Sequence, residues 1–245
     1  MKKLISVLLL ITLVFTLAAC GGTSTPTADS SAATTAPEST PASTPAASTF
    51  DETVAPDPNS FSLRIEGNYG NLYYGYLPVG DGNLLTLLEN FDTGNTKITI
   101  EGLSDGYITK INNEATGSFG GWDGWCVLIN GESPMVGISD VTVSEGDKVV
   151  LYYGDPWGVG MAYPEFEVGG TRILFYTSTQ ISATGDVTNM KVIIDGHEYN
   201  TGELGFITLD EPLAPGEHTM QIERKSANGL CLALRFAPDF TFEVQ

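Results

Sequence analysis

The sequence predicts a mainly β protein that follows an unstructured N-terminal segment. Two dense apolar runs, 125–129 (WCVLI) and 148–153 (KVVLYY), are bounded by turn residues and have the length of buried strands. Further short β-branched and aromatic runs follow residue 158, separated by turn signals. One stretch alone has the apolar spacing of an amphipathic helix. These observations indicate several β-sheets with little helix.

The first folded part is expected to span residues 60–157. Its helix is predicted over 84–91, where four apolar side chains share one face, with Asn83 as the N-cap. Residues 68–78 carry four tyrosines among glycines and predict either a hairpin or an irregular aromatic loop. The other predicted strands, besides the two apolar runs, are 61–66, 97–101 and 107–111. One helix crossing a small mixed sheet is an α+β arrangement, and a β-grasp fold fits it.

The second part is expected to span residues 158–245, after a glycine-rich joint at its start. It contains only short predicted strands, at 171–177, 190–194, 205–209, 218–223, 230–235 and 240–244. Turn dipeptides such as Asp195-Gly196 and Asn228-Gly229 separate them. Strands at this spacing favour an immunoglobulin-like β-sandwich.

The N-terminus has the features of a secretory leader. Two lysines precede a short apolar run, and residues 1–19 therefore read as a signal peptide. Residues 17–20 (LAAC) resemble a bacterial lipobox, which implies cleavage before Cys20 and lipidation of its thiol. The alternative is an ordinary secreted protein in which Cys20 is incidental. Residues 20–59, rich in Ser, Thr, Ala and Pro, predict a disordered tether.

These features predict a protein held at the cell membrane by lipid and facing the extracellular or periplasmic side. The partner at this end of the chain is the lipid bilayer, through acylated Cys20. The formal net charge is −19, and removal of the leader with its two lysines leaves −21. Such a charge repels nucleic acid, so nucleic-acid binding is not expected.

The sequence shows no catalytic or metal-binding motif, and the protein is predicted not to be an enzyme. Nucleophile-elbow, phosphate-loop and zinc-protease patterns are absent. The histidines at 197 and 218 fit turn or strand-edge positions. Cys126 and Cys231 are expected as two buried thiols, although a disulfide between them remains an alternative. Loop acids at 123, 155 and 195 fit solvated surface charge, with weak calcium binding as the alternative.

Large aromatic side chains around the first apolar run are the candidate binding residues. Trp122 and Trp157 lie in glycine-rich loops, where a surface role competes evenly with packing. Trp125 and Tyr153 belong to the strands, where core packing is the stronger interpretation. The tyrosine-rich stretch adds Tyr73 and Tyr74, since tyrosines among Gly and Asn suit recognition loops as well as hairpin packing.

The first part resembles the transcobalamin-like C-terminal domain family over about residues 61–157. The residues that carry the resemblance are the helix 84–91, YITKIN at 107–112, GGWDGW at 120–125, VLING at 127–131, GISD at 137–140 and EGDKVVLYY at 145–153. In animal cobalamin carriers this domain closes over one side of cobalamin, and a helical domain covers the other. The resemblance therefore implies a corrinoid as one ligand, although nothing in this chain corresponds to the helical domain.

The second part resembles immunoglobulin-like and carboxypeptidase-regulatory-like modules. The residues that carry this shorter resemblance are MKVIIDG at 190–196, GFITL at 205–209 and PGEH at 215–218. It implies an architecture and no chemistry.

The expected function is non-catalytic binding at the cell surface through the aromatic loops. The ligand is a corrinoid, another small molecule, a glycan or a peptide. The alternative is a structural or adhesion spacer, or an assembly subunit that contacts an envelope protein. The position of Trp122 and Trp157 separates these hypotheses, because a binding module should have them lining a concavity.

Overall fold

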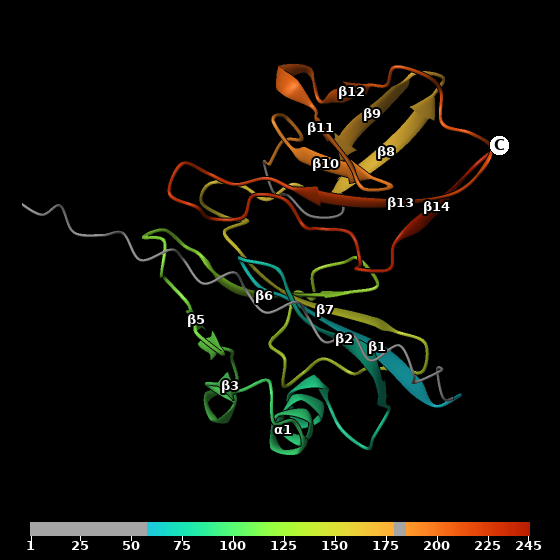
Figure 1. Cartoon of the computed structure of the whole chain (residues 1–245). Helices are drawn as coiled ribbons and strands as arrows, with labels where there is room; N and C mark the ends of the chain where they lie inside the picture. Colours follow the sequence, from blue (N-terminus) through green and yellow to red (C-terminus); the bar gives the residue numbers. More distant parts are fainter. Residues whose placement is uncertain (1–57, 179–184) are drawn as a thin grey trace, which may run out of the picture. The chain divides into compact units, whose positions relative to one another are not determined.

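A computed structural model describes residues 58–178 and 185–245 of the chain (Figure 1). The predicted signal peptide, Cys20 and the tether lie outside the described residues. The described residues belong to one compact unit, and they form several β-sheets with little helix. The predicted mainly β fold is therefore confirmed, whereas the boundary between residues 157 and 158 stays a prediction. Within the described ranges, no helix is long and apolar enough to cross a membrane.

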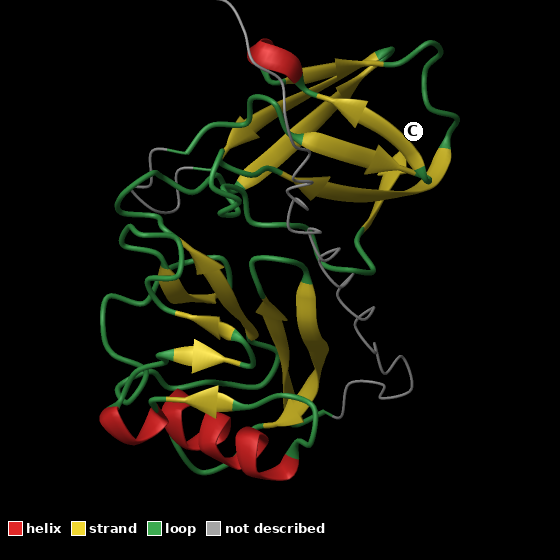
Figure 2. Ribbon diagram, turned by 60° about the vertical axis from the view of Figure 1, so that its left-hand side comes forward, coloured by secondary structure: helices red, strands yellow, loops and turns green. Residues whose placement is uncertain are grey.

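The first sheet has the strand order β2-β1-β7-β6. Its strands are β1 (Ser60–Glu66), β2 (Asn71–Pro78), β6 (Gly124–Ile129) and β7 (Lys148–Gly154). The two central strands, β1 and β7, are parallel, and each is flanked by its antiparallel hairpin partner. A helix packs against one face of this mixed sheet (Figure 2). This arrangement is the predicted β-grasp, and the tyrosine-rich stretch is a hairpin strand.

Helix α1 (Leu84–Gly94) begins at the predicted residue and continues to Gly94, beyond the predicted stretch 84–91. Asn83 is its N-cap, and the Asn83 side chain accepts a hydrogen bond from the amide of Thr86 at 3.0 Å. The side chains that α1 buries are Leu84, Leu87, Leu88 and Phe91, on the face that the apolar spacing indicates. They pack against β1 and β7 to form the first core.

The strands predicted at 97–101 and 107–111 are much shorter than expected. The structure has β3 (Ile100–Glu101), β4 (Lys110–Ile111) and β5 (Glu114–Ala115), which form a separate three-stranded sheet. A 3₁₀ turn at 103–105 interrupts the first two strands, between glycines at 102 and 106 that both have positive φ. The alternating pattern correctly predicted where these strands lie, but the turn between them limits each strand to two paired residues.

The main sheet has two faces that the strand alternation separates. On β1, the odd-numbered residues 61, 63 and 65 face the helix and belong to the first core. On the same strand Ser62 and Arg64 line the opposite face, as do Leu128 on β6 and Val150 on β7. Both faces of the two apolar strands are therefore covered, as their continuous apolar runs predict.

The second part contains two packed antiparallel sheets, with strand orders β12-β9-β8 and β11-β10-β13-β14. The strands are β8 (Pro164–Gly169), β9 (Arg172–Thr177), β10 (Lys191–Ile194), β11 (His197–Asn200), β12 (Phe206–Thr208), β13 (Gly216–Glu223) and β14 (Thr241–Val244). Ile173, Val192 and Ile222 meet in the core between them. This is the predicted immunoglobulin-like sandwich of three plus four strands.

Sequence analysis missed two of these strands and predicted one that does not form. β8 contains a proline and two glutamates, and β11 is a polar edge strand after a tight turn, so neither has a strong apolar pattern. The predicted strand at 230–235 forms only isolated bridges, at Cys231 and Ala233. The Cys231 and Arg235 amides instead bond the side chains of Asn68 and Glu66, which lie far away in the sequence.

Candidate functional site

The three tryptophans line one hollow beside strand β6. Its volume is about 420 Å³. Trp122 and Trp157 are 80% and 63% exposed, whereas Trp125 is half-buried. Tyr107 and Val136, both more than half exposed, line the same hollow. We refer to this site as the tryptophan groove.

Trp125 forms the fixed floor of the tryptophan groove. Its indole N–H donates to the carbonyl oxygen of Glu114 at 2.9 Å. Its ring meets the Tyr153 ring edge to face, with centroids 5.4 Å apart. Because both polar and apolar contacts hold the indole, one of its faces is presented in a fixed orientation.

Asp123 holds the loop that carries Trp122. The Asp123 carboxylate is 1% exposed and accepts hydrogen bonds from the amides of Phe119 (3.1 Å) and Gly121 (3.0 Å). The Tyr153 hydroxyl donates to it at 2.5 Å. Burial alone would raise the pKa of Asp123, but the hydrogen bonds from Tyr153 and the two amides outweigh it and lower that pKa.

Asp155 links the loops of the two exposed tryptophans. Its buried carboxylate accepts from the Trp122 amide at 3.2 Å and from the Gly158 amide at 2.7 Å. A Cβ atom at Gly121 would lie 2.7 Å from that carboxylate, and one at Gly158 would also collide with it. Both glycines are therefore needed for the close approach, which fixes the indole-bearing loops relative to each other.

The interpretation of loop acids as solvated surface charge is wrong for Asp123 and Asp155. Both are 1% exposed, because their oxygens bond to backbone amides instead of water. Asp195 is exposed and accepts from the amide of Thr219 and from the ring of His218. In the described part of the chain, no cluster of three or more acidic, His or Cys side chains suits a metal ion.

The other predicted site residues are not among those that line the tryptophan groove. Tyr153 is 1% exposed and belongs to the core, as the competing interpretation held. Tyr73 faces the helix and packs edge to face on Phe91, with ring centroids 4.8 Å apart. Tyr74, its neighbour on β2, points to the opposite face and lines a different cavity. The predicted aromatic set is therefore divided among the groove, the core and a second cavity.

Burial disfavours the thiolate form of both described cysteines, and two acceptors hold the ring of His218. Burial raises the pKa of Cys126 to about 11, and it also raises the pKa of Cys231. The structure has both as free thiols, as expected, although Cys126 is only half-buried. His218 sits at the edge of β13, with Asp195 at 2.6 Å and the Ala214 carbonyl oxygen at 2.8 Å.

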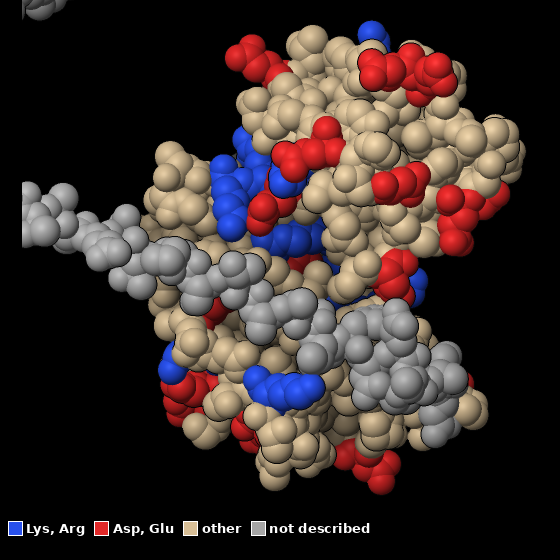
Figure 3. Space-filling model, viewed as in Figure 1, with Lys and Arg blue, Asp and Glu red and all other residues tan. Residues whose placement is uncertain are grey.

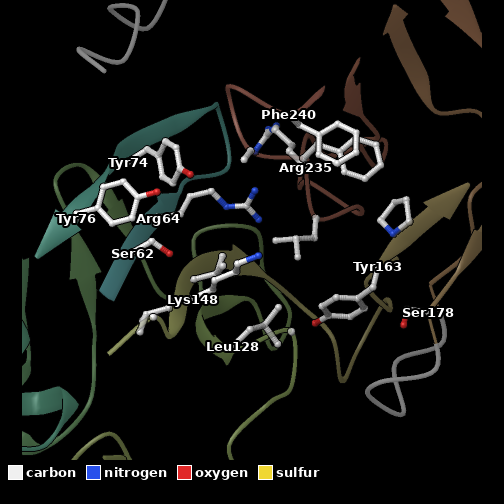
Figure 4. A pocket seen from close by; sticks show the side chains of 18 of the residues that line it. Ser62, Arg64, Tyr74, Tyr76, Leu128, Lys148, Tyr163, Ser178, Arg235 and Phe240 are labelled. Carbon is white, nitrogen blue, oxygen red and sulfur yellow. The ribbon is translucent and has the colours of Figure 1, made fainter. Parts of the chain in front are cut away.

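A larger cavity of about 630 Å³, which sequence analysis missed, lies on the face of the main sheet opposite the helix (Figure 4). Arg64 and Lys148 line it from β1 and β7, and Leu234 and Phe240 line it from the second part. The alternating pattern of 61–66 places Arg64 on the face of the strand that points away from the first core. This pattern could have indicated the wall of the cavity that β1 forms. The other walls include Leu128, Lys148 and Leu234, which are far from Arg64 in the sequence, so no local pattern indicates the cavity.

Acidic side chains are scattered over the visible face of the molecule, while basic ones gather beside acidic ones (Figure 3). Ion pairs of this kind are Arg224–Asp186 at 2.9 Å and Arg235–Glu223 at 3.2 Å. By contrast, no Lys or Arg among the described residues lines the tryptophan groove. The groove therefore suits an uncharged, flat-faced ligand better than an anion.

Comparison with known proteins gives one match. Residues 81–155 match the family described as "Domain of unknown function (DUF4430)", which is related to transcobalamin-like domains. The matched range contains helix α1, the small sheet, β6, β7 and the residues Trp122 and Trp125. No curated protein and no solved structure matches the chain.

Proposed function

We propose that this protein is a non-catalytic cell-surface lipoprotein that binds an uncharged ligand in the tryptophan groove. The observation that carries the proposal is the position of Trp122 and Trp157, both largely exposed and lining the same hollow. Exposed indoles are costly in water and contribute most of the binding energy when a ligand covers them. A spacer has no need of such a pair.

The support of the loops strengthens the proposal. Two buried carboxylates fix the backbone of both indole-bearing loops before any ligand arrives. A site ordered in advance loses less conformational entropy on binding than a flexible loop. The groove volume, about 420 Å³, lies in the range of small-ligand sites.

Among the ligand classes, a glycan fits the lining best. Sugar rings are uncharged and stack their C–H faces on aromatic rings, while their hydroxyls need polar groups at the rim. The groove offers three indoles for stacking, and Thr116 and Ser133 for hydrogen bonding. A corrinoid, which the related family suggests, and an apolar peptide are the other candidates.

The proposal places the protein at the membrane, anchored by lipid on Cys20. The lipobox-like residues 17–20 and the preceding apolar run support this anchor. The Ser/Thr/Pro-rich residues that follow would tether the folded part outside the cell. The envelope is then the source of the ligand.

Calorimetric titration of the whole chain tests the groove. The probes are a β-1,4-linked N-acetylglucosamine tetramer, cyanocobalamin and a hydrophobic pentapeptide. We expect the tetramer to bind, and both Trp122→Ala and Trp157→Ala to weaken it about tenfold or more, because each removes a stacking face. Tyr176→Ala, which removes an exposed aromatic ring of strand β9, is the matched control and should leave the affinity unchanged.

Each outcome either assigns a ligand class to the tryptophan groove or excludes the groove as a binding site. Tryptophan-dependent binding of cyanocobalamin alone would replace the glycan by a corrinoid, and such binding of the peptide alone would indicate a peptide site. If no probe binds, or if both tryptophan variants bind as the wild type does, the groove is not the binding site and the spacer hypothesis is favoured.

A further inference from the structure

The larger cavity contains an arginine whose hydrogen-bonding capacity is largely unused. Arg64 is 9% exposed, and its one ion pair in the described part of the chain is to Glu66, at 3.5 Å. Its Nε atom is buried without a hydrogen-bond partner among the described residues. Buried polar groups nearly always have partners, and a guanidinium offers five donors. Apart from that ion pair, the cavity therefore presents a buried cation whose other donors have no acceptor among the described residues.

Arg235 lines the same cavity, but most of its hydrogen-bond donors have partners in the protein. Its guanidinium donates to the carbonyl oxygens of Gly67 and Asn68, both at 2.8 Å, and pairs with Glu66 and Glu223. Both terminal nitrogens of this guanidinium are hydrogen-bonded to protein groups. Arg235 is thus a structural residue, and Arg64 is the arginine left for a ligand.

Lys148 supplies a second positive charge on the same face. Strands β1 and β7 are parallel, with Lys148 opposite Ser62 and Val150 opposite Arg64. The two cationic side chains therefore lie two positions apart on one face, and both reach into the same open space (Figure 4). Lys148 is exposed and has no ion pair within residues 58–178 and 185–245.

The rest of the cavity is mostly apolar and aromatic. Leu128 and Val150 rise from the sheet beside the cations, and Leu234 and Phe240 close the opposite side. Tyr163 adds a further ring, and its hydroxyl is already hydrogen-bonded to Tyr152. A ligand that fits this lining has a compact hydrophobic body and one anionic end.

We propose that this cavity binds a small monocarboxylic acid with an aromatic or branched apolar body. The carboxylate of the ligand accepts hydrogen bonds from Arg64 and forms an ion pair with Lys148. The apolar body of the ligand packs between Leu128, Leu234 and Phe240. A planar carboxylate matches the donor geometry of a guanidinium. Glu145 and Glu165 also line the cavity, and their charge disfavours dianions such as phosphate. The site is separate from the tryptophan groove.

Calorimetric titration of the whole chain with matched probes tests this proposal. The probes are 3-phenylpropanoate, its amide and 3-phenylpropylamine, which share one body and differ in charge. We expect the acid to bind, the amide to bind at least about tenfold more weakly, and the amine not to bind, because charge-assisted hydrogen bonds are about twice as strong as neutral ones. Equal binding of acid and amide would overturn the proposal, as would no binding of the acid. This comparison needs no variant.

Variants then locate the site. Arg64→Gln should abolish binding of the acid, Arg64→Lys should retain part of it, and Lys148→Gln should weaken it, in proteins whose thermal unfolding shows them folded. Arg172→Gln, which removes an exposed arginine of strand β9, is the matched control. Unchanged affinity in a folded Arg64→Gln variant would refute the assignment. The Trp122→Ala variant should bind the acid with unchanged affinity. The test of this cavity therefore does not depend on whether the tryptophan groove binds a ligand.

Discussion

Single residues decide how the tryptophan groove is held open. Asp123 and Asp155 look like ordinary loop acids in the sequence, yet the fold buries both and surrounds them with donors. A carboxylate can accept several hydrogen bonds at once, so one short side chain organises a whole loop. The orientation of the exposed indoles therefore depends on two buried carboxylates.

Asp123→Asn is expected to destabilise the protein by about 2 kcal/mol at pH 7, because an amide cannot accept from all the donors that now share the carboxylate. The folded-state pKa of Asp123 is lowered below 3.8, so its contribution is complete above that pH and is lost as the pH falls through the folded-state value. Urea unfolding at pH 7 and pH 3 measures this.

The gap between wild type and Asp123→Asn should therefore narrow at pH 3. Asp210→Asn, which changes an exposed loop carboxylate, is the control and should leave the stability at pH 7 nearly unchanged. A gap of the same size at both pH values would mean that the charge of Asp123 is not what stabilises the loop.

At the scale of elements, helix α1 is the one whose sequence and structure agree most closely. Its cap, its buried face and its end are all local features, because each depends on residues within a few positions. The cap residue also makes a long-range contact, since the side-chain amide nitrogen of Asn83 donates to the Ser139 carbonyl oxygen at 2.5 Å. That bond joins the helix start to the loop before β7.

Asn83→Ala should lower the stability by about 1 kcal/mol, which corresponds to roughly 2–4 °C in Tm for a domain of this size. Asn83→Ser keeps an N-cap acceptor but loses the bond to Ser139, so it separates the two contributions. Thermal unfolding of the three proteins provides the comparison. An equal loss in both variants would show that the Ser139 bond matters and the cap does not.

At the scale of the whole molecule, a buried ionic cluster joins strand β1 to the segment that follows β13. The Arg235 amide donates to Glu66 at 2.7 Å, and the Arg235 guanidinium bonds the two backbone carbonyls that follow Glu66. Burial raises the pKa of Glu66 even though Arg64 and Arg235 act in the opposite direction. Loss of the Arg235 guanidinium would leave Glu66 with one counter-ion, Arg64 at 3.5 Å, and two buried carbonyls without that donor.

Arg235→Met should destabilise the protein by about 3–5 kcal/mol, because it removes one of the two cations beside Glu66 and leaves two buried carbonyl groups without the guanidinium donor. Adding Glu66→Gln should recover part of that loss, since it removes a buried charge that has lost one of its two counter-ions. Urea unfolding of the wild type, both single variants and the double variant gives the coupling energy. Strictly additive effects would contradict the cluster.

Local patterns were sufficient for most of the elements. The continuous apolar runs of β6 and β7, the helix spacing and the turn-bounded strands of the sandwich all appear within windows of a few residues. The same locality explains the errors. Residues 230–235 have the composition of a strand, but the amides of Cys231 and Arg235 bond the side chains of Asn68 and Glu66, and nothing nearby in the sequence shows this.

The sequence by itself determined the mainly β class, the helix with its cap, and the glycine-rich setting of Trp122 and Trp157. Each of these depends on backbone propensities and on the period of apolar residues, which act between neighbours. Only the tertiary structure decided that two aspartates are buried beneath the indoles, that Tyr73 and Tyr74 face opposite ways, and that Arg64 meets Lys148 in a cavity. Burial and pairing of charges depend on which distant segments come together, and that is settled only when the chain folds.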